Sequence, residues 1–195
     1  MKPQLHNRCS IRLKGYDYSQ KGLYFITLCT QYRRNLFGKI EHGEMILNEA
    51  GKMINEEWQA LTGRYLDIIL HEYIVMPNHF HSILEITNGN SVRAPLVGAP
   101  IGDTGAPIGD TGTPESVRAP LVGAPTLGNI IGAYKSITTV KYIENVKKNN
   151  WKRFTKKLWL RNYWEHIIRN EKEYQRISQY IINNPQKWQQ DKFYK

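Results

Sequence analysis

The sequence predicts an α+β fold in which helices pack on one face of an antiparallel sheet. Segments rich in β-branched and aromatic residues alternate with segments whose apolar residues recur at helical spacing, in the order β, α, β, β, α, β, α. The second and third strands are joined by the short turn "MPN", as neighbouring antiparallel strands commonly are. This order is typical of a ferredoxin-like arrangement.

The first half of the chain supplies three strands and one helix. Residues 22–30, "GLYFITLCT", predict a strand because β-branched and aromatic residues dominate them. Residues 48–63 predict a helix. Its apolar residues at helical spacing are Met53, Ile54, Trp58 and Leu61. Two more strands are predicted at 66–76 and 79–87, on either side of "MPN".

The second half supplies two helices and one extended segment. A helix is predicted over 126–148, with the threonine at its start as N-cap. Residues 157–169, "KLWLRNYWEHIIR", predict either an edge strand or an extended segment. The final helix, 170–184, begins at an asparagine N-cap, has Glu173 as the partner in a capping box, and is stopped by Pro185.

One segment interrupts this pattern. Residues 88–126 consist mainly of Gly, Pro, Ala, Thr and Val, and "SVRAPLVGAP" occurs in them twice, at 91–100 and 116–125. Between these copies "APIGDTG" also occurs twice. Proline interrupts helices and central strands, and the repeats are too short to stack as a solenoid. We therefore expect a single domain over 1–195 that carries a flexible insertion.

Composition narrows the class of partner. Lys and Arg number 27 against 17 Asp and Glu, a net charge of +10, which favours nucleic acid first and an acidic membrane surface second. Cys9 and Cys29 have no metal-ligand or redox spacing, so we expect reduced thiols in a cytoplasmic protein. No run approaches the roughly 20 apolar residues of a membrane span, so no membrane-spanning segment is expected. With nucleic acid as the favoured partner, we expect no membrane partner.

Two histidines stand out in the stretch "IVMPNHFHSILEI". His79 and His81 are two residues apart in a predicted strand, so their side chains share one face and Phe80 points to the other. Two neutral imidazoles on one face can bind a single divalent metal ion. A hydrogen-bonded histidine pair is the other reading of so short a pattern.

The final helix offers further groups for such a site. Tyr180 and Asn184 are four residues apart, which places both on one helical face. An amide oxygen suits a hard cation such as Mg²⁺ or Mn²⁺, and a phenol can attack phosphorus. The alternative interpretation of Tyr180 is a core residue of an amphipathic helix. Tyr163, with His166 three residues later, is a competing nucleophile, although in extended chain these two fall on opposite faces.

Four stretches in order carry a family resemblance. They are "YFITLCTQYRRNLFG", "YIVMPNHFHSILEI", "LGNIIGAYKS" and "NYWEHIIRNEKEYQRISQYIINNP". The series resembles the REP-associated tyrosine transposases, which belong to the single-tyrosine HUH transposase superfamily. It spans nearly the whole chain outside 88–126. HUH stands for His, bulky hydrophobic, His, which here is the series from His79 to His81.

The resemblance implies an activity and a set of site residues. Such enzymes cut hairpin-forming single-stranded DNA by tyrosine attack, leave a 5′-phosphotyrosine and a free 3′-hydroxyl, and rejoin ends by the reverse reaction. Position by position, His79, His81 and Asn184 correspond to the metal ligands and Tyr180 to the nucleophile. The resemblance also implies a protein of the bacterial cytosol and nucleoid. It leaves open a monomer or a homodimer that exchanges the tyrosine helix.

Basic residues are candidates for contacts with DNA phosphates. The candidates are Arg33, Arg34, Lys135, Ser136, Lys152, Arg153, Lys156, Lys157 and Arg161. The cluster at 152–161 is the strongest because aromatic residues interleave it, as in proteins that stack single-stranded bases. Each candidate taken singly is equally well read as part of a solvated charged face.

Two other functions compete with a strand transferase. One is a hairpin DNA-binding protein that has lost strand transfer, although binding alone needs neither the ligand set nor Tyr180. The other is an unrelated metal-dependent hydrolase that uses only the histidine pair. The hydrolase would act without a covalent protein–DNA adduct.

Overall fold

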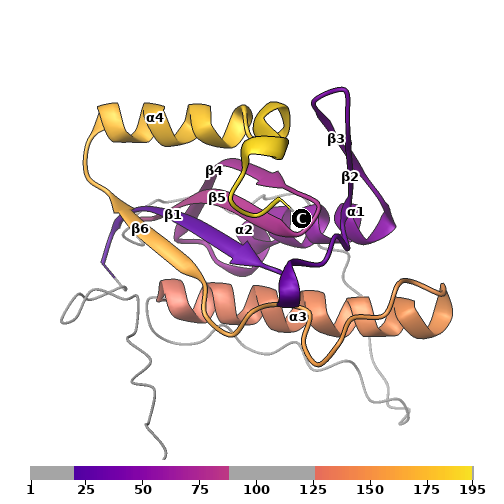
Figure 1. Ribbon diagram of the computed structural model, residues 1–195. Coiled ribbons are helices and arrows are strands. Elements are labelled where there is room, and N and C mark those ends of the chain that lie inside the picture. The colour runs from indigo at the N-terminus through magenta and orange to yellow at the C-terminus, as the bar shows by residue number, and fades with distance from the viewer. Residues whose placement is uncertain (1–19, 88–125, 195) are drawn as a thin grey trace, which may run out of the picture.

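A four-stranded antiparallel sheet forms the centre of the molecule (Figure 1). The computed structural model describes residues 20–87 and 126–194. The strand order is β4-β5-β1-β6, and every neighbouring pair is antiparallel. The strands are β1 (Gly22–Cys29), β4 (Ile68–Val75), β5 (His79–Ile86) and β6 (Trp164–Ile168). The α+β class with a ferredoxin-like sheet is confirmed, and the segment left open between edge strand and extended chain contains the edge strand β6.

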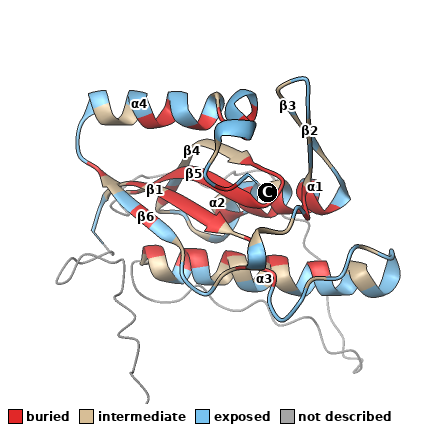
Figure 2. Ribbon diagram, in the orientation of Figure 1, coloured by how far each residue is buried: buried red, intermediate tan, exposed pale blue. Residues whose placement is uncertain are grey.

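Two helices cover one face of the sheet. They are α1 (Glu49–Gln59) and α3 (Leu127–Lys148). Trp58 of α1 is fully buried and lies between Phe80 of β5 and Tyr134 of α3, with ring centroids 4.8 and 5.1 Å away. Figure 2 shows the buried residues gathered in the central strands and on the helix surfaces that meet them. Burial of this apolar surface is the main stabilising contribution to the fold.

The last helix, α4 (Glu171–Ile182), lies on the opposite face of the sheet (Figure 1). Its Ile177 and Ile181 pack against Ile83 of β5 and Ile168 of β6. The expectation of helices on one face therefore holds for α1 and α3, while α4 adds a layer on the other side. This placement brings the predicted tyrosine helix over the histidine side of β5.

Helix ends follow the capping signals. The side chains of Thr126 and Asn170 accept hydrogen bonds from Asn129 N and Glu173 N, as predicted for N-caps. The Glu173 carboxylate, however, accepts from Arg169 N at 3.0 Å, one residue before the position that a capping box requires. Beyond α4 the chain does not stop turning, because a 3₁₀ helix, η2 (Pro185–Gln190), begins at the predicted stop.

Smaller elements surround this framework. A hairpin of β2 (Gly38–Glu41) and β3 (Glu44–Leu47) turns at His42 and Gly43, whose φ angles of 51° and 79° suit a tight two-residue turn. Single turns are found in η1 (Gln31–Arg33) and α2 (Leu61–Arg64). The sequence patterns do not distinguish these short elements from loops.

Two earlier expectations fall partly outside the described residues. The insertion at 88–126 lies outside them except for Thr126, so its flexibility and the single-domain organisation stay predictions. Cys9 also lies outside, whereas Cys29 is a free thiol whose pKa burial raises to about 11. Within residues 20–87 and 126–194, none of the helices is both long and apolar enough to cross a membrane.

Candidate active site

Side chains from three strands line up beneath α4. Across the antiparallel ladders, Thr27 of β1 lies directly opposite His81 of β5 on one side and Trp164 of β6 on the other. Because directly paired residues project to the same face of a sheet, these three side chains form a row. Phe25 and His166 form the next row, two residues along each strand.

His79 presents one nitrogen to the space beneath α4. It is fully buried, and its Nδ1 lies 2.9 Å from Asn78 Oδ1. The Asn78 amide donates from Nδ2 to the carbonyl oxygens of Arg33 and Phe193, so its Oδ1 must be the acceptor. His79 Nδ1 therefore carries the proton. His79 Nε2 keeps a lone pair and is buried with no hydrogen-bond partner among the described residues.

His81 is held in the same way from β1. Its Nδ1 lies 2.8 Å from Thr27 Oγ1 and its Nε2 lies 3.2 Å from the Tyr180 hydroxyl oxygen. Burial, with His79 and Lys192 acting in the same direction, lowers the pKa of His81 well below its usual value. Burial also lowers the pKa of His79 to about 4. Both rings are neutral at physiological pH, which is the form that binds metal ions.

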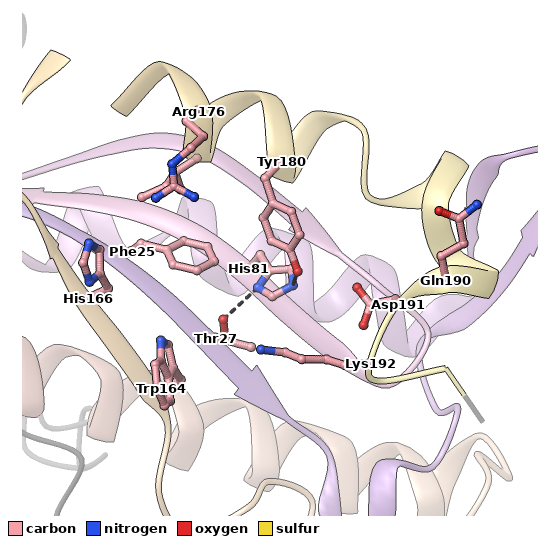
Figure 3. A pocket seen from close by; sticks show the side chains of 11 residues that line it. Phe25, Thr27, His81, Trp164, His166, Arg176, Tyr180, Gln190, Asp191 and Lys192 are labelled. Carbon is pink, nitrogen blue, oxygen red and sulfur yellow. Dashed lines mark hydrogen bonds between the residues drawn. The ribbon is translucent and has the colours of Figure 1, made fainter. Parts of the chain in front are cut away.

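Tyr180 lies on the lower side of α4, above His81 (Figure 3). Its side chain is 39% exposed, and its hydroxyl reaches the histidine nitrogen described above. Burial and the carboxylate of Asp191 raise the pKa of Tyr180 to about 12, and Asn184 opposes them. The phenol therefore keeps its proton at neutral pH, so attack by Tyr180 needs a group that accepts this proton.

Asn184 lies two residues after the end of α4 and belongs to the same site. It is 2% exposed, and its Nδ2 donates to Asp191 Oδ2 at 3.2 Å. This bond turns Oδ1 away from Asp191, and Oδ1 is buried without a hydrogen-bond partner in the described structure. Asn184 opposes the lowering of the His79 pKa and the raising of the Tyr180 pKa, so its amide lies near both.

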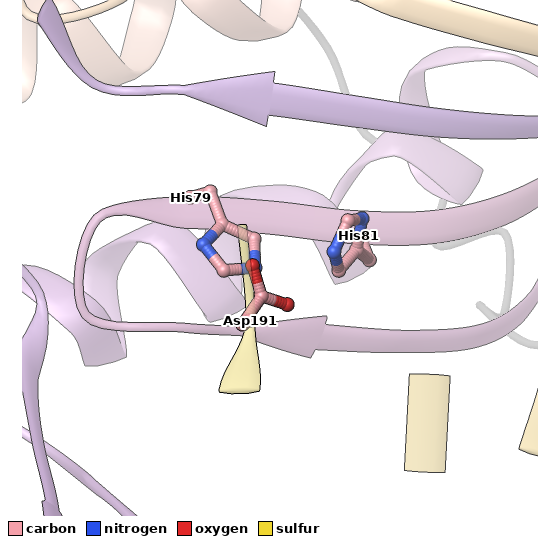
Figure 4. Close-up of side chains that lie close together, drawn as sticks. All are labelled: His79, His81 and Asp191. Carbon is pink, nitrogen blue, oxygen red and sulfur yellow. The ribbon is translucent and has the colours of Figure 1, made fainter. Parts of the chain in front are cut away.

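Asp191, which the sequence did not single out, completes the group. The possible ligand atoms of His79, His81 and Asp191 all lie within 4.8 Å of one another (Figure 4). Phe193 N donates to Asp191 Oδ1 at 2.6 Å, which fixes the carboxylate. The only sequence signal for Asp191 is that it is the one acidic residue after Glu173.

These residues fit a divalent cation. Two neutral imidazoles, a carboxylate and an amide oxygen make a mixed N/O donor set suited to Mg²⁺ or Mn²⁺. Among the described residues, the buried His79 Nε2 and Asn184 Oδ1 have no hydrogen-bond partner, and this supports the fit because buried polar atoms are nearly always paired. A cation bound here would give both atoms a partner.

Comparison with known proteins identifies a relative of this chain and a solved structure of similar fold. No family model matches the chain. An uncharacterized protein of Haemophilus influenzae is 34% identical over 193 residues, which cover 97% of this chain and 94% of the relative. The two proteins belong to one family. A solved REP-associated tyrosine transposase, bound to a REP hairpin, matches 91% of this chain and 74% of its own, with a TM-score of 0.53 and 17% identity.

The chain has the fold of the REP-associated tyrosine transposases. The resemblance inferred from the sequence motifs is thereby confirmed at the level of the fold. In this fold His79 and His81 lie on β5, and Tyr180, the predicted nucleophile, lies on α4 above them.

Most of the predicted DNA-contacting residues lie together along α3. A cavity of about 310 Å³, the basic groove, runs between α3 and the segment before β6. Its lining includes Lys135, Ser136, Lys156, Lys157 and Arg161. Arg153 borders an adjacent hollow around Phe154, Lys152 lines a different one beside Trp151, and Arg34 donates to Thr155 Oγ1 at 3.1 Å.

Like Arg34, Lys135 and Arg33 have hydrogen-bond partners within the protein. The Lys135 ammonium donates to the carbonyl oxygens of Leu160 and Arg161 at 2.7 and 2.9 Å. Burial, with Lys157 nearby, lowers the pKa of Lys135 to about 8. Arg33 lies apart from the basic groove and donates to the carbonyl oxygen of Lys192 at 2.7 Å.

The competing nucleophile lies elsewhere. Tyr163 packs against the core cluster on the α1/α3 side of the sheet. Its neighbour His166 forms a 2.7 Å contact with Glu173 of α4. The group of possible metal ligands therefore lies beside Tyr180 on the α4 side of the sheet.

Proposed function

We propose that this protein is a metal-dependent, tyrosine-nucleophile strand transferase that acts on hairpin-forming single-stranded DNA, as a transposase does. One observation carries the proposal. The Tyr180 hydroxyl lies 3.2 Å from His81 Nε2, at the edge of a buried donor set that suits a divalent cation. A nucleophile beside a cation site is the arrangement that phosphoryl transfer requires.

The chain's own groups account for the covalent step. Tyr180 Oη attacks the phosphorus and forms a phosphotyrosine bond to the 5′ side, while the bond from phosphorus to the 3′ oxygen breaks. The phenol proton passes to the Asp191 carboxylate, whose influence on the pKa of Tyr180 places it nearby. The leaving 3′ oxygen takes up this proton from Asp191 and becomes a free 3′-hydroxyl. The reverse attack by a 3′-hydroxyl rejoins DNA and regenerates Tyr180.

His79, His81 and Asn184 would hold the cation, and the Asp191 carboxylate lies beside them. When bound, Mg²⁺ or Mn²⁺ would supply Lewis-acid polarisation of the phosphoryl oxygen. Because both histidines are buried and neutral, they can bind a cation without first losing a proton.

The basic groove supports a DNA substrate. Lys156, Lys157 and Arg161 are exposed along α3, where phosphates can reach them. The transposase of the same fold is bound to a REP hairpin, which favours a hairpin here too. A protein with this activity works on chromosomal DNA, so we propose the bacterial cytosol and nucleoid as its location. It would act there as a monomer or a homodimer.

A covalent-adduct assay tests the proposal. Purified protein is incubated with hairpin single-stranded DNA from its gene's flanking repeats and Mn²⁺ or Mg²⁺, then run on a denaturing gel. We expect an adduct with wild type and with Tyr163→Phe, and none with Tyr180→Phe. Loss only with Tyr163→Phe would assign the nucleophile to the segment before β6.

One observation favours a second candidate, a hairpin-binding protein without strand transfer. Burial and Asp191 raise the pKa of Tyr180 to about 12, which disfavours the reactive phenolate. The same gel separates the two functions. Retarded but uncleaved DNA on a native gel, with no adduct in any lane, would support the binding protein, provided several flanking repeats are tried. Cleavage without an adduct would instead indicate a hydrolase.

A further inference from the structure

We propose that the cavity between Trp164 and Tyr180 is a nucleotide subsite, in which the Trp164 ring stacks on one base beside the phosphate that Tyr180 attacks. This inference rests on the proposed function and names a part of the same site. It assigns to Trp164 a role in binding and positioning the substrate, with no part in the bond-making step.

The cavity has the size and the walls that a nucleotide needs. Its volume is about 590 Å³, within the range of small-ligand pockets. Its floor is the sheet surface made by Thr27, Phe25 and Trp164, and its roof is α4 (Figure 3). Tyr180 and His81 line the same cavity, so a base in it lies next to the proposed reaction centre.

Trp164 is exposed in a way that packing does not explain. Its side chain is 52% exposed, whereas Trp58, Trp159 and Trp188 are at most 7% exposed and Trp151 is partly buried. An edge-strand tryptophan that faces a cavity leaves much of its apolar ring in water. Aromatic rings in this position bind single-stranded nucleic acid by stacking on bases.

Positive charge flanks the ring. Lys192 Nζ, at the end of a flexible side chain, lies over the Trp164 ring, 6.0 Å from its centroid, and Arg176 of α4 lines the same cavity. Arg176 is 72% exposed and lies 3.8 Å from Glu173 in a long ion pair, so its guanidinium is accessible to a phosphate. A base on Trp164 would thus have cations close by for its phosphates.

The chain also connects this cavity to the basic groove. Arg161 lines the groove along α3, and Trp164 begins β6 three residues later. DNA whose hairpin lies along the groove could pass over Arg161 and place its single-stranded end in the cavity. The occupant we infer is therefore a base of the single-stranded segment that flanks the hairpin.

Binding, measured apart from cleavage, tests the subsite. The Tyr180→Phe protein, which cannot form the adduct, is titrated by fluorescence anisotropy against labelled hairpin oligonucleotides at one salt concentration. Each nucleotide flanking the hairpin is replaced in turn by an abasic residue. We expect one abasic position to weaken binding about 5- to 150-fold, the range for loss of one base–aromatic stack.

The second variant makes the test specific to Trp164. Adding Trp164→Ala should weaken binding of intact DNA by the same factor, and the sensitive abasic position should then cost nothing further. Trp164→Phe keeps a ring and should retain most of the affinity. Leu66→Ala is the matched control, because Leu66 is 77% exposed and lies outside the cavity. Circular dichroism checks that each variant is folded.

The outcomes separate this inference from the proposed function. Unchanged affinity in Trp164→Ala, or an abasic penalty that persists in that variant, would overturn the stacking role while hairpin binding stands. Hairpin binding with the expected pattern, but no adduct from wild type, would keep the subsite and overturn strand transfer. No binding of any hairpin by either protein would overturn both.

Discussion

At the scale of single residues, two neutral side chains decide which nitrogen each histidine presents. Thr27 and Asn78 each contact the Nδ1 atom of a histidine, so the two Nε2 atoms face the proposed cation site. A partner on the second nitrogen fixes both the tautomer and the ring orientation of a metal-binding histidine. The two histidine rings are therefore oriented by residues that would not touch the cation.

The first prediction concerns Thr27. Thr27→Val keeps the shape of the side chain but removes the hydroxyl, so His81 loses the partner that orients it. We expect Mn²⁺ affinity, measured by titration calorimetry, to fall about 10- to 100-fold. The unpaired buried nitrogen should also lower the free energy of unfolding by about 1–2 kcal/mol. Thr27→Ser keeps the hydroxyl and serves as the control; equal Mn²⁺ affinity in Val and Ser variants would contradict the role.

Local patterns in the sequence were sufficient to predict most of the side chains that lie together in the candidate site, while their roles stay predictions. His79 and His81 share a face through strand alternation, and Tyr180 and Asn184 share one through helical spacing, so each pair could be predicted from a few residues. Asp191 could not, because its position depends on how the chain folds back after η2. No local spacing encodes that return.

At the scale of elements, a bulge in β4 positions the tyrosine helix. The β4–β5 register shifts between Leu70 and Tyr73, and the residues in the bulge are His71 and Glu72. The Tyr174 hydroxyl of α4 donates to Glu72 Oε2 at 2.9 Å and lies 3.3 Å from His71 Nδ1. Bulges re-aim side chains in this way. The irregularity in β4 thus supplies polar anchors for α4.

The second prediction concerns Glu72, whose carboxylate anchors α4. Glu72 also accepts a hydrogen bond from Ser178 Oγ at 3.1 Å, so Glu72→Ala frees two points of α4. We expect a loss of about 1–2 kcal/mol in the free energy of unfolding, because each such bond contributes modestly at a partly exposed site. Amide exchange in α4 should accelerate, and adduct formation by Tyr180 should slow.

Glu72→Gln is the matched control. Its amide oxygen can still accept at least one of these hydrogen bonds, so its effects should be smaller than those of alanine. Amide exchange in α4 that stays unchanged in Glu72→Ala would show that the apolar contacts of Ile177 and Ile181 suffice to dock the helix.

Element prediction succeeded where periodicity was long and failed where it was short. The helix from Leu127 to Lys148 matches its prediction, because many turns of apolar residues define it. The hairpin of β2 and β3 was missed because each strand has only four residues. The bulge at His71 was also missed, since the alternation of the strand continues through it in sequence but not in pairing.

At the scale of the whole molecule, one carboxylate joins three helices on the face opposite α4. Glu57 of α1 is 5% exposed and contacts Lys141 of α3 and, at 2.8 Å, Arg64 of α2. Burial raises the pKa of Glu57, but the hydrogen bonds from Lys141 and Arg64 outweigh it and hold the pKa below its ordinary value. The charged form therefore stabilises the folded chain.

The last prediction follows from the sign of this shift. A carboxyl whose pKa is lower in the folded state contributes stability above its unfolded pKa and loses it as pH falls through the folded pKa. At pH 7 we expect Glu57→Gln to unfold about 1–2 kcal/mol more easily than wild type. The value is below that for a fully buried pair, because Lys141 and Arg64 are 48% and 37% exposed.

Urea unfolding across pH tests this expectation. The difference between wild type and Glu57→Gln should be constant near neutrality, shrink once pH falls below the ordinary carboxyl value of 4.5, and vanish below the folded pKa. Glu56→Gln removes an exposed charge one residue away and should change stability by less than about 0.5 kcal/mol. A difference for Glu57→Gln that does not depend on pH would mean that packing of the side chain, rather than its charge, holds α1 to α3.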